Sequence, residues 1–329
     1  MVKSKKAKVS KEQSFFKLVE GRIQHLFKQD KGKTAGNYAC ALSQFRKYRE
    51  EQDILIKDLS VSLMKDFQSY LIKKGLKMNT ISLYMRMLRA AYNYALDEEI
   101  ILEDKRPFRK VFTGQEKTRK RAIRKDVVKQ IINLTDMNRS LEFARDMFLF
   151  SIYMQGMAFV DIAHLAKEQI RSGYIIYQRR KTNQRLRIAI HPYVREIIKK
   201  WQVEDSNCPY LFPILYNPKR KKTVKYSSAL RIHNKRLNQI SCLLKLEEPL
   251  SSYVARHTWA SQAKWIGIKD TIICEAMGHN NIETTAIYLA SLNIDVITSA
   301  NKKVIASLTR NGLRRKLCEE NQEKENAFF

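Results

Sequence analysis

Residues 251–290 read SSYVARHTWASQAKWIGIKDTIICEAMGHNNIETTAIYLA. Apolar residues recur in this stretch at helical spacing and predict three helices, at 251–266, 270–277 and 283–290. Gly278 stands where the second helix ends, and His279 follows it. Arg256 precedes His279 by 23 residues, and Tyr288 follows it by nine. Each of these side chains alone has an ordinary structural explanation, so a functional meaning must come from their order and spacing.

Upstream of this stretch, the second half of the chain is predicted to be mostly helical, with one pair of strands. The helical pattern covers 126–135, 141–156, 159–169, 193–202 and 226–243. Two short apolar runs, at 173–177 and 186–190, are typical of strands. The turn between them, residues 178–185, has the charged sequence QRRKTNQR.

The first half is predicted to form a bundle of four helices, at 14–28, 35–50, 61–74 and 80–97. Gly75 stands at a C-cap position, and Asn79 is a candidate N-cap. Arg86 and Arg89 lie off the apolar face of the fourth helix, where either solvent or phosphate can reach them. Glycine and proline are scarce, with 10 and 6 residues, which favours helices. We therefore expect a mainly α fold with a small β-sheet or hairpin.

The charge of the chain indicates a polyanionic partner. Its 329 residues include 62 Lys and Arg against 33 Asp and Glu, a formal charge of +29. Both parts are basic, with 24 basic against 13 acidic residues in 1–115 and 38 against 20 in 116–329. Arg121 and Arg124 fall in a basic stretch between helical segments. Nucleic acid is the leading interpretation of this charge, and a lysine-rich solubilising surface is the alternative.

Several other classes of protein lack their signals here. No run of about 18 apolar residues could span a bilayer, and no apolar stretch follows the basic N-terminus as in a secretory signal. The five cysteines form no C-x-x-C pair, which argues against a disulfide framework or a zinc site. We expect a protein of a reducing compartment, with no metal and no membrane partner.

The order and spacing of Arg256, His279 and Tyr288 resemble the signature of the tyrosine recombinase (phage integrase) family. The family pattern is H-x-x-R-H-T, then L-G-H, then a tyrosine, at the same intervals. In this chain the first two stretches read YVARHT and MGH. The K-T pair at 181–182 on the predicted turn and the H-P pair at 191–192 also match.

The resemblance covers roughly residues 12–310 and implies a phosphoryl transfer that needs no metal and no cofactor. It implies that Tyr288 attacks the scissile phosphate to form a 3′-phosphotyrosyl link and that Arg256 clamps the phosphate. It also implies that His279 donates to a phosphate oxygen and that Lys181 is the general acid. These residue types suit the chemistry, because a phenol with a pKa of about 10 is a weak nucleophile and fixed cations stabilise the developing negative charge.

Two positions depart from the family pattern. The family's first arginine lies in T-G-L-R, with an acid three residues later, whereas this chain has Ala158 followed by Asp161. Tyr253 replaces the first histidine of H-x-x-R, and its hydroxyl can still donate a hydrogen bond. His257 follows the clamping arginine and either orients it or has a structural role. The chain resembles a branch from mobile elements of anaerobic bacteria, with GMSFVD and YVARH stretches, which implies an active variant rather than a dead enzyme.

The charge missing at position 158 has several candidate replacements. Gln155 could donate an amide hydrogen bond. Arg145 lies 13 residues before position 158, about 20 Å along a straight helix, which is too far for the same phosphate. The charged turn offers three more candidates, Arg179, Arg180 and Arg185. The sequence does not choose among them, and we expect a site that works with fewer charges.

By resemblance, the chain divides into five parts. These are a basic arm at 1–12, a four-helix core-binding (SAM-like) DNA domain at 13–105, a basic linker at 106–125, an integrase-type catalytic domain at 126–310 and a C-terminal tail at 311–329. The apolar residues beyond Tyr288 either fold back on their own domain or dock on a neighbouring protomer, and docking implies a homotetramer on DNA. Accessory DNA-bending proteins are further candidate partners, and the nucleoid of the bacterial cytoplasm is the expected location.

We therefore expect a site-specific recombinase of double-stranded DNA, either an integrase or an invertase. The alternatives are a catalytically silent DNA-binding regulator on the same fold and a tyrosine-type topoisomerase. The candidate DNA contacts are Arg86, Arg89, Arg121, Arg124, Arg179 and Arg180. The sequence does not reveal the target site, or whether the reaction is integration, inversion or resolution.

Overall fold

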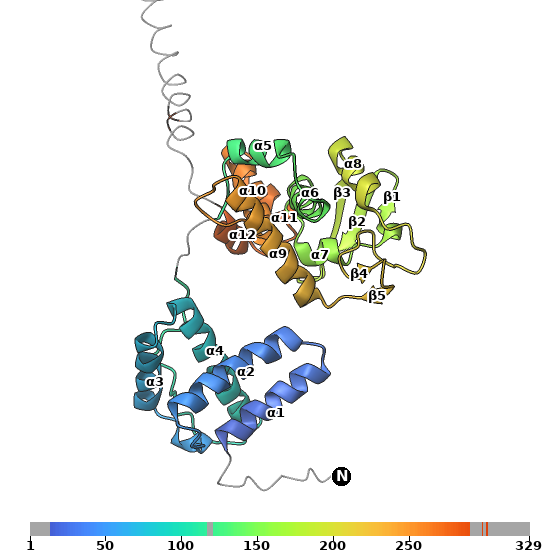
Figure 1. The fold of residues 1–329 in the computed structure, drawn as a ribbon. Coiled ribbons are helices and arrows are strands. Elements are labelled where there is room, and N and C mark those ends of the chain that lie inside the picture. Colours follow the sequence, from blue (N-terminus) through green and yellow to red (C-terminus); the bar gives the residue numbers. More distant parts are fainter. Residues whose placement is uncertain (1–13, 117–120, 290–297, 299–300, 302–329) are drawn as a thin grey trace, which may run out of the picture. The chain divides into compact units, whose positions relative to one another are not determined.

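The computed structural model describes residues 14–116, 121–289, 298 and 301, without the side chains of Ile282, Ile287 and Tyr288. The chain divides into two compact units, Met1–Thr118 and Arg119–Phe329 (Figure 1). The basic arm predicted at 1–12 and the tail predicted at 311–329 lie outside the described residues. Within the described part of the chain, no helix is long and apolar enough to cross a membrane.

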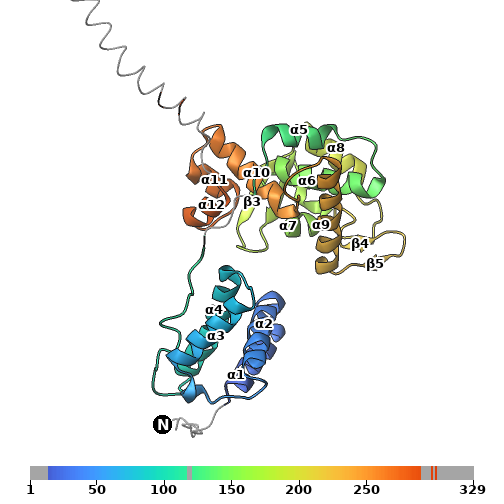
Figure 2. The ribbon, with the colours of Figure 1, turned by 60° about the vertical axis from the view of Figure 1, so that its left-hand side comes forward.

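Four α-helices and one 3-10 turn form the first unit: α1 (Phe15–Lys28), α2 (Gly32–Tyr48), η1 (Ile56–Asp58), α3 (Val61–Lys73) and α4 (Met78–Asp97). Hydroxyl caps begin two of them, since Ser14 accepts the N–H of Lys17 and Ser60 accepts the N–H of Leu63. Helices α1 and α2 lie side by side in both ribbon views (Figures 1 and 2). The four helices expected in this half are confirmed, with ends shifted by a few residues.

Aromatic rings dominate the core of the first unit. Phe45 of α2 is fully buried, and its ring centroid lies 5.0 Å from that of Phe67 and 5.9 Å from that of Phe15, both edge to face. Such pairs add to the free energy gained by burying the rings. Arg86 and Arg89 are exposed on α4, as its apolar pattern predicts.

Asn79 does not cap α4, contrary to the prediction. Lys77 occupies the N-cap position. The Asn79 amide instead donates to the backbone oxygen of Glu116 at 3.1 Å and accepts the N–H of Glu116 at 2.8 Å. A short amide side chain pairs with whichever backbone groups lie nearest, and here it ties α4 to the end of the unit. Gly75 follows the C-cap of α3 in the left-handed conformation, with φ +78°.

The second unit has eight α-helices in its described part: α5 (Lys125–Asn133), α6 (Arg139–Tyr153), α7 (Phe159–Ala163), α8 (Pro192–Trp201), α9 (Tyr226–Leu243), α10 (Ser252–Trp265), α11 (Asp270–Ala276) and α12 (Ile282–Tyr288). An antiparallel sheet contains β1 (Ile170–Arg171), β2 (Tyr174–Gln178) and β3 (Arg185–Ala189) in that order. A smaller hairpin joins β4 (Tyr216–Asn217) to β5 (Lys222–Thr223).

Helix α6 lies at the centre of the second unit, where it packs against α8, α9 and α10. The β2–β3 register pairs Ile175 with Ile188 and Tyr177 with Leu186, and all four side chains are buried. The sheet and α6 therefore share one hydrophobic core. This core holds the β2–β3 loop and α10 in fixed positions.

The sequence pattern missed the shortest elements of the second unit. The helix predicted at 159–169 ends at Ala163, and its remainder forms a 3-10 turn, η2 (Lys167–Gln169), that leads into β1. Strand β1 and the β4–β5 hairpin do not follow from the sequence pattern, because strands of two residues are too short to show alternation. The architecture is mainly helical with two small sheets, which confirms the predicted fold class.

Candidate active site

Arg256 of α10 joins two separate turns of the second unit. This residue is 3% exposed. One terminal nitrogen, Nη1, donates to the backbone oxygen of Gly156 at 2.6 Å, and the other, Nη2, donates to that of Met277 at 2.6 Å. The planar guanidinium suits this arrangement because its nitrogens diverge in a fixed fork.

The turn at 154–157 is shaped to approach Arg256 closely. Gln155 and Gly156 both have positive φ, at +56° and +70°. A Cβ atom at position 156 would lie 3.2 Å from the Arg256 Cα. Only glycine combines this backbone conformation with this approach without strain. Gln155 precedes this glycine and is itself in the left-handed region, a conformation of non-glycine residues that clusters at functional sites.

His279 follows the second of these turns, and its hydrogen bonds fix its tautomer. Its Nε2 lies 2.9 Å from Nη2 of Arg256. Because a guanidinium only donates, Nε2 must accept, so the ring proton lies on Nδ1 and is donated to Oγ1 of Thr285 at 2.9 Å. Burial, followed by the positive charges of Arg256, Arg179 and Lys181, lowers the pKa of His279 to about 3. The imidazole is therefore neutral near pH 7.

Thr285 carries this network to the helix that ends at Tyr288. It is fully buried and lies three residues before Tyr288 on α12, within one helical turn. Tyr288 is the last residue of α12, and its side chain lies outside the described part of the structure. The chain of hydrogen bonds from Arg256 through His279 thus reaches the helix of the predicted nucleophile.

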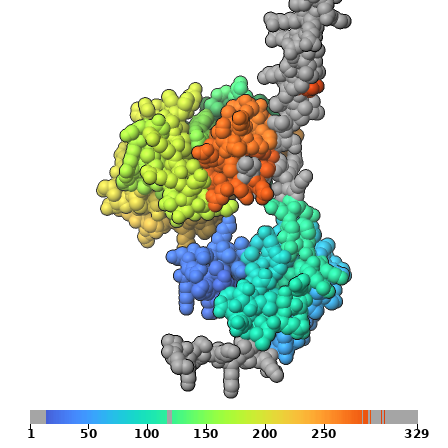
Figure 3. All heavy atoms as spheres, turned by 180° about the vertical axis from the view of Figure 1, so that it is seen from behind, coloured from blue at the N-terminus to red at the C-terminus, as the bar shows by residue number. Residues whose placement is uncertain are grey.

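The β2–β3 loop attaches to the same turn. Thr182 donates from Oγ1 to the backbone oxygen of Gly278 at 3.1 Å, and Arg179 donates to that oxygen through Nη1. Lys181 lies between them in the loop and is exposed. Figure 3 shows the orange surface of residues 252–288 beside the yellow-green surface of the strands. Arg179 and Gly278, 99 positions apart in the chain, are therefore in direct contact.

Asp161 is buried beneath this loop, with 4% of the residue exposed. Its Oδ1 accepts the backbone N–H of Arg180 at 3.0 Å. Burial raises the pKa of this carboxyl, and the N–H of Arg180 and the charges of Arg179 and Arg256 oppose that rise. Ala158 is the N-cap of α7, three residues earlier. The acid singled out from the sequence therefore lies against the β2–β3 loop.

The auxiliary candidates lie around Arg256. His257 is buried, and its ring meets that of Tyr253 edge to face at 4.7 Å, while Tyr253 is 43% exposed. Gln155 is partly exposed in the turn that accepts from Arg256. These positions are compatible with supporting roles for all three.

The candidate DNA contacts divide between the two units. Arg86 and Arg89 belong to the first unit. Arg121 and Arg180 are exposed in the second. Arg124 is also exposed, but it pairs with Asp126 at 2.6 Å, and its hydrogen bond lowers the pKa of that carboxyl to about 2. Arg179 differs from the others, because it is buried.

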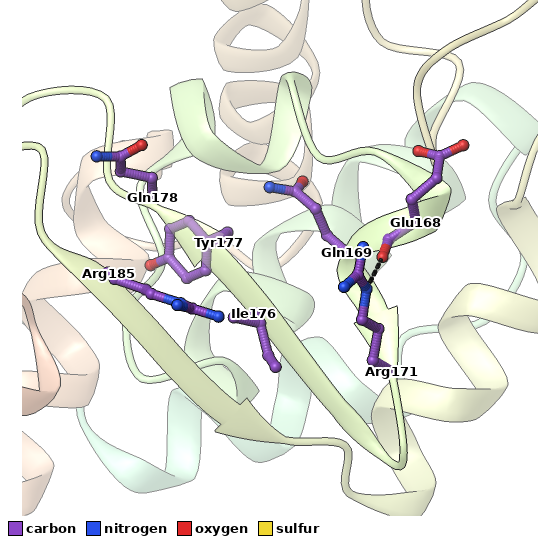
Figure 4. Close-up of a pocket in the computed structure, with 7 residues that line it drawn as sticks. All are labelled: Glu168, Gln169, Arg171, Ile176, Tyr177, Gln178 and Arg185. Carbon is purple, nitrogen blue, oxygen red and sulfur yellow. Dashed lines mark hydrogen bonds between the residues drawn. The ribbon is translucent and has the colours of Figure 1, made fainter.

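A hollow of about 400 Å³ lies beside β2 (Figure 4). It is lined by Glu168, Gln169, Arg171, Ile176, Tyr177, Gln178 and Arg185. Arg171 donates from Nε to the backbone oxygen of Glu168 at 2.9 Å, the dashed line in the figure. None of the four predicted catalytic residues is among those lining the hollow. A long substrate that lies along a surface does not require its chemistry to take place in such a hollow.

Two contributors to the site were not found from the sequence. Gly156 accepts from Arg256, 100 residues away in the chain, and Thr285 accepts from His279, which lies in the turn before α12. The spacing of Thr285, one turn before Tyr288, was the available signal for its place on the same helix face. No group of three or more His, Cys, Asp or Glu side chains that could hold a metal ion occurs among the described residues.

Family models match both units of the chain. The model described as Phage integrase SAM-like domain matches residues 14–111, and that of the Phage integrase family matches residues 121–293. A tyrosine recombinase of Pseudothermotoga lettingae is 21% identical over 276 residues, covering 80% of this chain and 90% of that protein. Tyrosine recombinase XerC of Pelotomaculum thermopropionicum is 22% identical over 250 residues, covering 73% and 79%.

Solved structures share the fold at low identity. The Tn1549 transposon integrase in complex with transposon right end DNA has a TM-score of 0.64 at 13% identity, covering 89% of this chain and 100% of that one. A lambda integrase tetramer bound to a Holliday junction has a TM-score of 0.64 at 16% identity, covering 85% and 78%.

Proposed function

The chain belongs to the phage integrase family and is a tyrosine-type site-specific recombinase acting on DNA, and we propose that Tyr288 is its nucleophile. The phenol of Tyr288 gives its proton to solvent and its oxygen bonds to the scissile phosphorus as the bond from phosphorus to the 5′ oxygen breaks. The 5′ oxygen takes up a proton and leaves as a hydroxyl. The 3′ phosphate of the cut strand stays on the tyrosine. The 5′ hydroxyl of another strand then reverses the step, so phosphodiester bonds are exchanged without an external energy source.

The observation that carries this proposal is the hydrogen-bonded connection between Arg256, His279 and α12. Arg256 donates to His279, and His279 donates to Thr285 on the helix that ends at Tyr288. A phenol needs stabilised charge in the transition state to react near neutral pH. A buried guanidinium held in this connection is preorganised to stabilise that charge.

Lys181 is proposed as the general acid that delivers a proton to the leaving 5′ oxygen. It lies exposed in the β2–β3 loop, whose neighbours Arg179 and Thr182 donate to Gly278, next to His279. The flexible stem of lysine allows its ammonium to reach an incoming strand. Proton transfer from a placed side chain contributes about 10²–10⁴-fold in rate.

His279 requires a change of partner for its proposed role. In the free protein its Nε2 accepts from Arg256, so it cannot donate to a phosphate oxygen from that atom. A phosphate that draws the Arg256 guanidinium toward itself would release Nε2. The imidazole could then bind a proton, because a nearby anion favours its charged form. We assign Tyr253, His257 and Gln155 to supporting roles around this clamp.

DNA binding is proposed to involve both units. Exposed arginines on α4, in the β2–β3 loop and at positions 121 and 124 of the second unit are suited to phosphate contacts. Lambda integrase binds core sites as a dimer and a Holliday junction as a tetramer. We propose a homotetramer on double-stranded DNA, joined through the C-terminal residues beyond Tyr288, in the bacterial cytoplasm. We also propose that Ala158 marks a variant branch that lacks the first catalytic arginine.

A nicked suicide substrate carrying the natural site tests this function. Wild-type protein should form a covalent adduct with DNA, and Tyr288→Phe should form none. Tyr193→Phe is the matched control, since Tyr193 is 64% exposed on α8. EDTA should leave the adduct unchanged. Absence of an adduct from wild-type protein would favour a silent DNA-binding regulator, and loss of the adduct in EDTA would contradict the metal-free mechanism.

A further inference from the structure

We propose that Arg179 provides the second guanidinium of the active site and takes over the charge that position 158 lacks. This inference rests on the proposed function. Arg179 follows β2 at the start of the charged loop, yet it is 3% exposed, whereas its neighbours Arg180 and Lys181 are exposed. Burying an arginine is costly unless its charge and its donors have partners.

Arg179 has an unused donor. Its Nη1 donates to the backbone oxygen of Gly278 and lies 3.5 Å from Oγ1 of Thr182, but its buried Nε has no hydrogen-bond partner. The ion pairs of the described residues do not include Arg179. Buried donors are nearly always paired, so the Nε of Arg179 is available to an acceptor that enters the site. A phosphate oxygen would form a stronger hydrogen bond with the Arg179 guanidinium than the neutral carbonyl of Gly278 does, because charge-assisted hydrogen bonds are stronger.

Arg179 and Arg256 bind adjacent residues of one turn. Arg179 donates to the oxygen of Gly278, and Arg256 donates to the oxygen of Met277 and to His279. Two guanidiniums are thus gathered around three consecutive residues. Their mutual repulsion falls when a phosphate bridges them. A scissile phosphate placed between two forks has its developing charge stabilised from two directions.

Glycine at position 278 leaves room for the Arg179 side chain, which a larger residue would crowd. Gly278 has φ +64°, and a Cβ there would lie 3.1 Å from Cδ of Arg179 and 3.1 Å from Cδ1 of Leu186. The glycine of the M-G-H stretch therefore does more than end α11. It lets the arginine from the sheet reach the turn that precedes His279.

The other candidates for the missing charge are less suited. Arg145 donates to Oδ1 of its neighbour Asp146 at 2.9 Å and to the backbone oxygen of Leu134 at 2.6 Å. Its donors are therefore directed to the region of α5 and α6. Arg180 and Arg185 are exposed. The expectation of a site with fewer charges is therefore replaced by this proposal.

The test compares Arg179→Ala with Arg171→Ala in the full-length protein. Arg171 is an exposed arginine of the same sheet, so its replacement by alanine removes the same charge and serves as the matched control. Arg179→Ala should slow single-turnover cleavage of the suicide substrate by about 10²–10³-fold, as for loss of one oxyanion donor. Its affinity for DNA should match that of Arg171→Ala. A cleavage rate for Arg179→Ala equal to that of Arg171→Ala would overturn the proposal.

A second substrate separates catalysis from support of the loop. A methylphosphonate at the scissile position lacks the negative charge of one non-bridging oxygen, so its transition state has less need of a second guanidinium. The ratio of wild-type to Arg179→Ala rates should fall toward one on this substrate. An equal ratio on both substrates would mean that Arg179 only holds the loop. Failure of wild-type protein to cleave its natural site would instead refute the proposed function itself.

Discussion

The two units of the chain bury different kinds of side chain. Among the described residues, the first unit buries one polar side chain, Ser82, in a core of aromatic and aliphatic groups. The second unit buries twelve: Asp146, Ser151, Asp161, Arg179, His233, Ser241, Arg256, His257, Thr258, Ser261, His279 and Thr285. Buried polar groups reduce stability unless they are hydrogen-bonded. The second unit therefore depends on a larger set of buried hydrogen bonds than the first.

Four of these twelve polar groups gather at one place. Arg179, Arg256, His279 and Thr285 belong to one set of contacts around the turn at 277–279. Substitutions in this set should affect the chemistry before they affect folding. Substitutions in the core of the first unit should have the opposite effect. The contrast gives four predictions.

The largest effect is expected from Arg256→Ala. It removes the donors to Gly156, Met277 and His279 at once. Adduct formation should fall by at least about 10³-fold, because charge stabilisation is lost together with the position of His279. Arg256→Lys keeps a charge but not the fork, and should recover little of the rate. Full recovery with lysine would show that only the net charge of this residue matters.

Phe45→Ala should act on folding alone. The ring of Phe45 is fully buried among Phe15, Phe16 and Phe67, so its removal should cost about 3–5 kcal/mol of unfolding free energy. All three tryptophans, Trp201, Trp259 and Trp265, lie in the second unit. The denaturant midpoint from far-UV circular dichroism should fall, whereas that from tryptophan fluorescence should not. Equal shifts by both probes would mean that the two units unfold as one.

The sequence predicts this division only in part. The helices of both units follow from periodicity, because long amphipathic segments carry a strong signal. The order of Arg256, His279 and Tyr288 was enough to point to the family. The burial of Arg179 was not predictable, because its loop is uniformly charged and nothing local distinguishes Arg179 from Arg180. It depends on Gly278, about a hundred residues away in the chain.

A smaller effect is expected from pH. Burial lowers the pKa of His233, which stacks on Phe159 at 4.1 Å, and that of His279, in both cases to about 3. The unfolded chain binds these two protons near pH 6.5. Between about pH 6.5 and 3 the unfolded state therefore holds more protons, and stability falls as the pH falls.

The second unit should lose up to about 1.4 kcal/mol per pH unit for each of these histidines. Urea titrations followed by tryptophan fluorescence at pH 7.5 and 5.5 would measure this loss. His233→Phe should reduce it by up to half. The first unit buries no histidine among its described residues, so Phe45→Ala should leave the pH dependence unchanged. A pH dependence that persists in full in His233→Phe would assign the effect to other groups.

The smallest effects should come from the exposed arginines of the first unit. Arg86 and Arg89 lie on the solvent face of α4, and Arg89 also donates to Oγ1 of Thr113 at 3.3 Å. If they contact phosphates, each alanine substitution should lower the slope of log affinity against log salt by about one and weaken binding to all sequences alike. Cleavage by bound protein should be unchanged. Arg106→Ala is the control, because Arg106 is 77% exposed and pairs with Asp104 at 3.6 Å. Because each contact releases about one counterion, an unchanged slope in both variants would make these arginines a solvated surface, and the first unit would then have to bind DNA through a different face.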